Sequence, residues 1–227
     1  MPISHSHKFI YIHIGKIAGS SMMQAFAEAG VTFDPISSAT FLDVIANRPD
    51  RDYLFGRWRK LFPLHGTEYP IQHLQAFLLK PLIPPEIWDS YYKFSFVRNP
   101  WDFMVSTYFY VQQIIDLVKQ SHPVVYEIVL GKSFKEFLTE AWPKIKTDYK
   151  SFLTDDNGRV LLDYIGRHER LDDDYAFLCA RLGIPHKALP HANVSEHENY
   201  RQYYDEETIE IVRRSFATEI EMFGYEF

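Results

Sequence analysis

Residues 91–100 read Tyr91-Tyr-Lys-Phe-Ser-Phe-Val-Arg-Asn-Pro100, and Trp101 follows them. The part before Arg98 is mostly aromatic and apolar, which predicts a buried β-strand. Proline fits the first turn of a helix, so Pro100 predicts a long helix from Trp101 to about Lys119. This part of the chain therefore reads as a strand, a short loop and a helix.

A second unit of the same kind lies near the N-terminus. Residues Lys8–Ile14 are apolar and β-branched and predict a strand that ends at Gly15. Residues Ser20–Ala29 predict a helix that is closed by Gly30. Strand and helix patterns also alternate further along the chain, which predicts an α/β fold.

The remaining patterns predict further helices and one β-hairpin. Helices are expected near Phe41–Ala46, together with a short strand, and at Tyr69–Leu79, Pro84–Asp89, Ser133–Ala141, Leu171–Leu182 and Asp205–Met222. The hairpin is expected at Ser151–Thr154 and Arg159–Ile165, with its turn at Asp155–Gly158. No internal repeat or clear linker is visible, so residues 1–227 are predicted to form one domain.

The composition argues against several classes of protein. A formal net charge of −6 opposes non-specific binding to nucleic acid, and a hydrophobic content of 46% is enough for a well-buried core. No apolar run reaches membrane-spanning length, and the N-terminus has no signal-peptide core. The single cysteine, Cys179, allows no intrachain disulfide. We therefore expect a cytoplasmic protein without a membrane span.

The loop after the first predicted strand reads His13-Ile-Gly-Lys-Ile-Ala-Gly-Ser-Ser21. Where such a loop enters a helix, backbone N–H groups and the helix dipole favour an anion. Ser20 and Ser21 add hydroxyl donors, and Lys16 adds a positive charge. A nucleoside triphosphate loop has its lysine directly after the last glycine, whereas Gly19 is followed by Ser20. We therefore expect a phosphate-type group that is bound without a metal ion.

Arg98 is a second candidate for anion binding. Its planar guanidinium suits phosphate oxygens, and Ser106 follows about two helical turns later. Parallel strands end at the same edge of a sheet, where ligands collect, so Lys16 and Arg98 are expected at one edge. Two cationic sites suit a nucleotide that carries phosphate at two positions. The alternative is that Arg98 pairs with Asp102 on the helix surface.

Both segments resemble the sulfotransferase family that includes the Golgi heparan sulfate 2-O- and chondroitin 4-O-sulfotransferases, and more closely its small bacterial members. Residues 94–108 resemble the 3′-phosphate block of that family, and residues 13–21 resemble its 5′-phosphosulfate loop. The resemblance continues through residues 152–155, 163–169, 193–200 and 222–227. It implies a P-loop-type three-layer domain with a central parallel β-sheet flanked by helices. The implied activity is transfer of a sulfonate group from 3′-phosphoadenosine 5′-phosphosulfate (PAPS) to an acceptor hydroxyl, on a carbohydrate.

The resemblance also implies which residues bind the donor. These are Lys16, Ile17, Ala18, Gly19, Ser20, Ser21, Arg98 and Ser106. Asn193, Ser195 and His197 lie in a polar loop and are candidates to cover the adenine or the 3′-phosphate, with a structural role as the alternative. Lys16 would also stabilise charge on the transferring group during catalysis. The family's usual proline and threonine are replaced by Gly15 and Ile17, and loss of the threonine hydroxyl is expected to lower the affinity for the donor.

The acceptor hydroxyl must lose a proton, and His65 is the predicted base. It lies in a polar turn, at the position of a family block in which histidine acts as the base in some carbohydrate enzymes. Glu68 is the second candidate and His73 the third, and a plain loop role for His65 stays open. Glu68 and Arg167 are candidates for binding the substrate.

The alternatives to a metal-free sulfotransferase are a metal site, a nucleotide kinase or NTPase, and a non-catalytic relative. His186, His191 and His197 have no cysteine partner and no helical register, so no metal site is predicted. A P-loop nucleotide kinase or NTPase would share the strand–loop–helix units but would require magnesium. A non-catalytic nucleotide-binding relative would bind the nucleotide without turnover. The sequence predicts neither the identity of the acceptor nor the oligomeric state.

Overall fold

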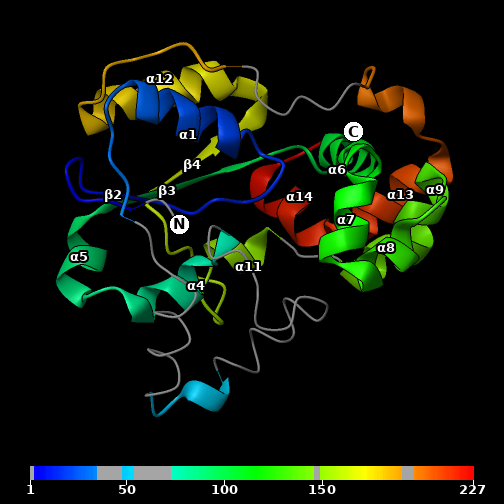
Figure 1. Ribbon diagram of the computed structural model, residues 1–227, viewed down its shortest axis with the longest axis horizontal. Helices are drawn as coiled ribbons and strands as arrows, with labels where there is room; N and C mark the ends of the chain where they lie inside the picture. The colour runs from blue at the N-terminus through cyan, green and yellow to red at the C-terminus, as the bar shows by residue number, and fades with distance from the viewer. Residues whose placement is uncertain (1–2, 35–47, 54–72, 146–148, 191–196) are drawn as a thin grey trace. The chain divides into compact units, whose positions relative to one another are not determined.

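The computed structural model describes residues 3–34, 48–53, 73–145, 149–190 and 197–227, labelled by element in Figure 1. The chain forms two compact units. The first comprises residues 1–60, 68–97 and 149–193, and the second comprises residues 61–67, 98–148 and 194–227. Within the described residues, every strand belongs to the first unit. The prediction of a single domain stays a prediction.

The first unit is built on a sheet that has four strands in the described part of the chain, in the order β1–β2–β3–β4. The strands are β1 (Ile3–Ser4), β2 (Phe9–Tyr11), β3 (Tyr92–Val97) and β4 (Tyr164–Arg167). β2 and β4 both pair parallel with β3, whereas β1 is antiparallel to β2. The predicted parallel sheet is confirmed, and the antiparallel strand at its edge makes the sheet mixed.

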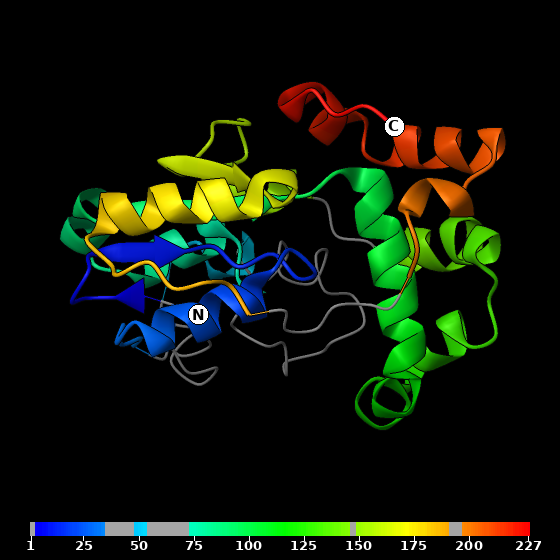
Figure 2. The same cartoon turned by 90° about the horizontal axis from the view of Figure 1, so that it is seen from above.

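Helices cover both faces of this sheet (Figure 1). α1 (Gly19–Glu28) and α12 (Leu171–Leu182) lie on the face that Figure 2 views from outside. α4 (Ala76–Leu79), α5 (Pro85–Ser90) and α11 (Lys150–Leu153) lie on the other face, with the short helix η2 (Lys80–Leu82) between α4 and α5. The short helix η4 (His168–Arg170) connects β4 to α12. The ring of Phe26 in α1 lies 5.5 Å from Phe9 of β2 and 5.6 Å from Tyr175 of α12. The predicted α/β arrangement of three layers is confirmed.

The second unit is helical in its described residues. Its elements are α6 (Pro100–Gln113), α7 (Ile115–Ser121), α8 (Pro123–Val129), α9 (Phe134–Glu136), η3 (Phe137–Ala141), α10 (Trp142–Ile145), η5 (Tyr200–Tyr203), α13 (Glu206–Ser215) and α14 (Ala217–Phe223). Trp142 packs 6.0 Å from Phe103 and 5.9 Å from Phe216, measured between ring centroids. Buried aromatic rings therefore join α6, α10 and the C-terminal helices of this unit.

Several predicted elements are correct. The helix at Leu171–Leu182 has its predicted bounds and ends at Gly183, whose φ of 66° stops a helix. The strand β3 and the helices α1 and α5 lie within one residue of their predicted bounds. The predicted strand and helix near Phe41–Ala46 lie outside the described residues.

Two long predicted helices are divided in the structure. The helix expected from Trp101 to Lys119 is broken at Ile114, and the helix expected to Met222 is broken at Phe216. Neither break carries glycine or proline, which is why the sequence did not predict it. Of the helix expected at Tyr69–Leu79, the described residues show only α4, because Gln75 is extended.

The turn predicted at Asp155–Gly158 is present, but the first strand of the predicted hairpin is wrong. Residues 150–153 form the helix α11, in which Thr154 donates its hydroxyl to the Lys150 carbonyl and Ser151 accepts a hydrogen bond from Gln75 beside α4. Around the turn, the N–H of Asp155 donates to the Arg159 carbonyl at 2.9 Å, and the N–H of Leu161 donates to the Leu153 carbonyl at 2.8 Å. An isolated bridge joins Thr154 to Val160, and β4 pairs with β3. Packing on the neighbouring helix and sheet outweighed the local strand pattern.

Among the described residues, no helix combines the length and the apolar character needed to cross a bilayer.

Candidate functional site

The loop between β2 and α1 leaves the sheet at its carboxyl edge. The N–H of Ile12 donates to the Phe94 carbonyl at 2.8 Å, and the Ser95 hydroxyl donates to the Ile12 carbonyl at 2.7 Å. These bonds fix the start of the loop on the neighbouring strand β3. Because the strands are parallel, the same edge holds Val97 and Arg167, which are register partners at the ends of β3 and β4.

The loop backbone has a shape that suits an anion. Lys16 and Ala18 have positive φ values of 63° and 53°, whereas Ile17 between them does not. Such alternation turns successive N–H groups toward one side and forms a concave anion site. Left-handed backbone at a non-glycine residue costs about 1–3 kcal/mol, so the surrounding structure holds this loop in place. Ala18 is also the N-cap of α1, and its side chain makes no capping hydrogen bond.

The side chains of the loop divide into an anchor and polar groups. Ile17 is 1% exposed, so its side chain anchors the loop in the core and only its backbone can face a ligand. Ser20 is exposed and Ser21 is buried at the start of α1. The first turn of a helix presents N–H groups that have no acceptor within the helix. The predicted donor-binding residues Lys16–Ser21 therefore lie together at one helix end.

A pair of histidines lines this loop, and the sequence analysis did not predict the pairing. The rings of His13 and His73 lie 4.5 Å apart, and His73 Nδ1 is 3.1 Å from the His13 carbonyl. A Cβ atom on Gly19 would lie 1.8 Å from Nε2 of His13, so the imidazole occupies the place of a side chain there. His73 Cε1 is 3.7 Å from the Cβ position of Gly15, beside Lys16. The signal in the sequence was a histidine directly after the strand, six residues before the glycine that begins the helix.

Both histidines are neutral near neutral pH. Burial, with the nearby charge of His73 as a smaller cause, lowers the pKa of His13 to about 3. Burial also lowers the pKa of His73 below its ordinary value of 6.5, although the hydrogen bond to the His13 backbone opposes this. A carbonyl oxygen can only accept a hydrogen bond, so Nδ1 of His73 carries the proton and Nε2 of its neutral ring is the basic nitrogen.

In the second unit, Arg98 pairs with Asp102, as the alternative interpretation held. Its Nε and Nη2 atoms donate to the two carboxylate oxygens at 2.7 and 2.9 Å. Residues 98, 102 and 106 are spaced by four, which places Asp102 and Ser106 on the same face of α6. Arg98 is 8% exposed and Ser106 is 2% exposed. The ion pair thus directs the guanidinium toward the face of the helix that carries Ser106.

His197 lies beside the same helix. Its ring stacks on Phe109 with centroids 5.7 Å apart and planes at 26°, and Tyr203 packs edge-on against Phe109 at 5.0 Å. Phe109 follows Ser106 by three residues, so the two are neighbours on adjoining turns. The second unit therefore gathers three of the predicted donor-binding residues, Arg98, Ser106 and His197, along α6.

The sequence profile described as the sulfotransferase family matches residues 1–226. The chain belongs to the sulfotransferase family. An uncharacterized protein of Archaeoglobus fulgidus is 27% identical to it over 131 residues, which are 57% of this chain and 98% of that protein. No solved structure matches the chain significantly.

Family membership supports transfer of a sulfonate group from a donor to an acceptor substrate. In this sulfotransferase, Arg167 ends β4 at the carboxyl edge, and its N–H donates to Asp174 at 2.6 Å. The predicted residues His65, Glu68, Asn193 and Ser195 lie outside the described part of the chain. Within that part, no group of three or more His, Cys, Asp or Glu side chains is arranged to hold a metal ion.

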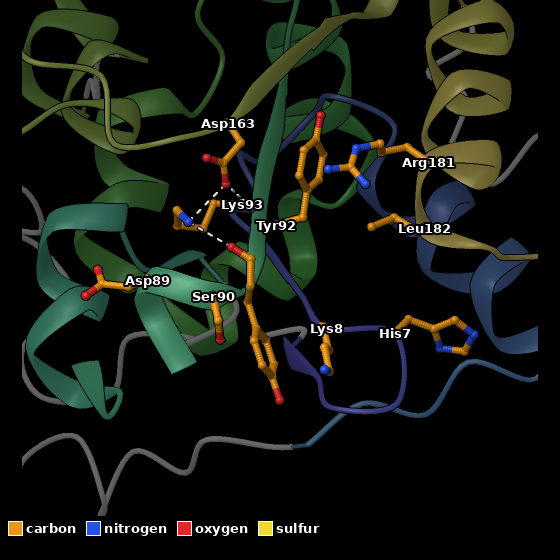
Figure 3. A pocket seen from close by; sticks show the side chains of 10 residues that line it. His7, Lys8, Asp89, Ser90, Tyr92, Lys93, Asp163, Arg181 and Leu182 are labelled. Carbon is orange, nitrogen blue, oxygen red and sulfur yellow. Dashed lines mark hydrogen bonds and ion pairs between the residues drawn. The ribbon is translucent and has the colours of Figure 1, made fainter. Parts of the chain in front are cut away.

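A pocket of about 340 Å³ lies at the opposite, amino edge of the sheet (Figure 3). Its lining includes Lys8 before β2, Lys93 in β3 and Asp163 before β4. The Lys93 ammonium donates to the carbonyls of Trp88 and Tyr91 and lies 2.9 Å from Asp163. These contacts account for Lys93 as a structural cation, and the loop of residues 13–19 lies at the other edge of the sheet.

Proposed function

We propose that this sulfotransferase transfers the sulfonate group of PAPS to a hydroxyl group of a carbohydrate acceptor. The observation that carries the proposal is the loop of residues 13–19, which brings alternating backbone, Lys16 and an uncapped helix start to the carboxyl edge of the sheet. The carbohydrate rests on the resemblance of residues 94–108 to carbohydrate enzymes. A cytoplasmic location, expected from the single cysteine, belongs to the same proposal.

The donor has two charged ends, and a separate group of residues is proposed to bind each of them. The start of α1 would bind the 5′-phosphosulfate through backbone N–H groups and the helix dipole, with Lys16 as the mobile cation. Arg98 and Ser106 would bind the 3′-phosphate, which is supported by the ion pair of Arg98 with Asp102, a residue on the same face of α6 as Ser106. A phosphate would then share the guanidinium with Asp102 or take the place of that carboxylate.

The reaction is an in-line displacement at sulfur. The acceptor oxygen forms a bond to sulfur, the bond from sulfur to the 5′-phosphate oxygen breaks, and 3′-phosphoadenosine 5′-phosphate leaves. Lys16 and the helix start stabilise the charge that develops on the departing oxygen. The proton of the acceptor hydroxyl passes to a base.

For the base we propose His73 in place of His65. His73 lies against Gly15 and therefore next to Lys16, and its Nδ1–H tautomer leaves Nε2 to take the proton. Its lowered pKa keeps the ring unprotonated below the pH at which an ordinary histidine gains a proton. The activity, measured as kcat/KM against pH, should therefore persist below pH 6.5, the ordinary histidine value.

Transfer from labelled PAPS to a panel of glycans, lipids and small alcohols, read by mass spectrometry, tests the proposal. His73→Gln should lower kcat by about 10²–10⁴-fold and leave binding of 3′-phosphoadenosine 5′-phosphate nearly unchanged in calorimetry. His65→Gln is the matched comparison. Full loss in His65→Gln with wild-type rates in His73→Gln would return the base to His65.

Lys16→Ala should lower kcat. Arg98→Ala should lower the affinity for 3′-phosphoadenosine 5′-phosphate more than the affinity for adenosine 5′-phosphate, which lacks the 3′-phosphate.

Turnover should survive EDTA. Turnover of ATP that depends on magnesium would point to a kinase or NTPase. Nucleotide binding without transfer to any acceptor would point to a non-catalytic relative.

A further inference from the structure

Four aromatic rings form a column that runs from the core of the sheet to the loop. Phe94 and Tyr11 stack with centroids 5.0 Å apart, Tyr11 and His13 stack at 5.6 Å, and His13 contacts His73 at 4.5 Å. Phe94 and Tyr11 are at most 1% exposed. The His73 ring therefore packs on a stack of rings that is anchored in the core.

His13 makes two contacts that no other described side chain combines. Its imidazole touches the ring of His73 on one side and fills the space above Gly19 on the other. Gly19 is the first residue of α1, the helix whose start faces the sulfonate donor in the proposed function. One side chain thus fixes the distance between the proposed base and the donor loop.

Tyr11 and His13 stay uncharged near neutral pH. The pKa of the Tyr11 phenol is raised by burial and that of His13 is lowered by burial, so neither carries charge near neutral pH. Neither group therefore takes up or releases a proton near neutral pH. The column can support the base without competing with it for the proton.

We propose that His13 is a positioning residue, which holds the His73 ring and the start of α1 in the geometry that sulfonate transfer requires. This rests on the proposed function. His13 itself touches neither reactant. A purely structural histidine would stabilise the fold and leave the chemistry of the remaining folded molecules unchanged.

Three variants separate the two contacts. His13→Ala removes both, His13→Phe keeps a ring against His73, and His13→Gln keeps a polar nitrogen near Gly19 without a ring. His122→Ala, which changes a partly exposed histidine at the junction of α7 and α8, is the control for loss of a histidine elsewhere. Each variant is measured for kcat and KM, for kcat/KM against pH, for its midpoint of thermal unfolding, and for the titration of His73 by NMR.

We expect His13→Ala to lower kcat about 10–100-fold with a change of only a few-fold in the KM for PAPS, because misplacement of a base affects the chemical step. Water that reaches His73 should raise its pKa in the NMR titration and shift the acid limb of kcat/KM to higher pH. His13→Phe should return the pKa of His73 most of the way to its wild-type value, whereas His13→Gln should not.

Wild-type kcat and an unchanged His73 titration in all three folded variants would overturn the proposal, even with a lower midpoint of unfolding. The NMR titration needs no acceptor. If the wild-type protein transfers no sulfonate, the proposed function is wrong. The NMR titration still reports in that case whether His13 sets the environment of His73.

Discussion

At the scale of single residues, the site depends on where small side chains permit close approach. Gly19 is needed because His13 lies where its Cβ would be, whereas Gly15 meets only the edge of His73 at an ordinary contact distance. The sequence predicted both glycines as parts of an anion loop. The sequence could not predict that the two positions tolerate a side chain differently, because only the fold brings His13 next to Gly19 and His73 next to Gly15.

Gly19→Ala and Gly15→Ala are therefore a matched pair. A Cβ at Gly19 would lie 1.8 Å from His13 Nε2, so this variant should be overpacked and lose about 1–3 kcal/mol of stability. At Gly15, which has no positive φ, the nearest atom to an added Cβ lies 3.7 Å away. The free energy of unfolding of Gly15→Ala should therefore lie within about 0.5 kcal/mol of the wild-type value. Urea unfolding of both variants measures the difference. Equal stability of the two would show that the His13 ring moves aside freely.

His13 should also make the stability depend on pH. Its pKa in the folded protein is about 3 against an ordinary value of 6.5, so between these values the unfolded chain binds more protons and stability falls as the pH falls. One such group contributes a slope of about 1.4 kcal/mol per pH unit. The wild type should therefore lose stability faster than His13→Gln between pH 6 and pH 4, measured by urea unfolding at each pH. Parallel curves for the two proteins would contradict this.

At the scale of elements, the helix α6 begins at a cap that also holds the C-terminus. The side-chain oxygen of Asn99, Oδ1, accepts a hydrogen bond from the backbone N–H of Trp101 at 3.0 Å. The side-chain nitrogen, Nδ2, donates to the backbone carbonyl of Glu226 at 2.8 Å. The sequence predicted a helix start at this place from Pro100 alone. The second role of Asn99 joins residues far apart in sequence and needed the structure.

Asn99→Ala should lose both bonds and destabilise the protein by about 1–2 kcal/mol. Asn99→Asp keeps the capping oxygen and suits the helix dipole but cannot donate to Glu226, so it should fall between the wild type and the alanine variant. The free energy of unfolding in urea measures both. An aspartate variant as unstable as the alanine variant would assign the whole effect to the C-terminal contact.

At the scale of the whole molecule, each of the two compact units is assembled from separate stretches of the chain. Residues 98–148 leave the first unit after β3, and the chain returns at residue 149 to supply α11, β4 and α12. Because neither unit is a continuous segment, loss of one disconnects pieces of the other. We therefore expect the single domain predicted from the sequence to describe the unfolding behaviour.

Scanning calorimetry tests this directly. One transition, with a calorimetric enthalpy equal to the van't Hoff enthalpy, is expected for the chain without ligand. Added 3′-phosphoadenosine 5′-phosphate should raise the midpoint, because ligand at about 100 times its Kd adds about 2.7 kcal/mol of stability. Two separate transitions, with only one moved by the nucleotide, would divide the chain into independent domains.

The sequence alone specified the strand–loop–helix units, since apolar runs, Pro100 and the glycines act over a few neighbouring residues. It also specified the sulfotransferase family and placed Lys16–Ser21 at a helix start. Tertiary packing fixed what depends on distant partners: the helix α11 in place of a strand, the breaks in the long helices, and the pairing of His13 with His73. Local preferences differ by less than the free energy of burying a face or closing a hydrogen bond, so long-range contacts prevail wherever the two disagree.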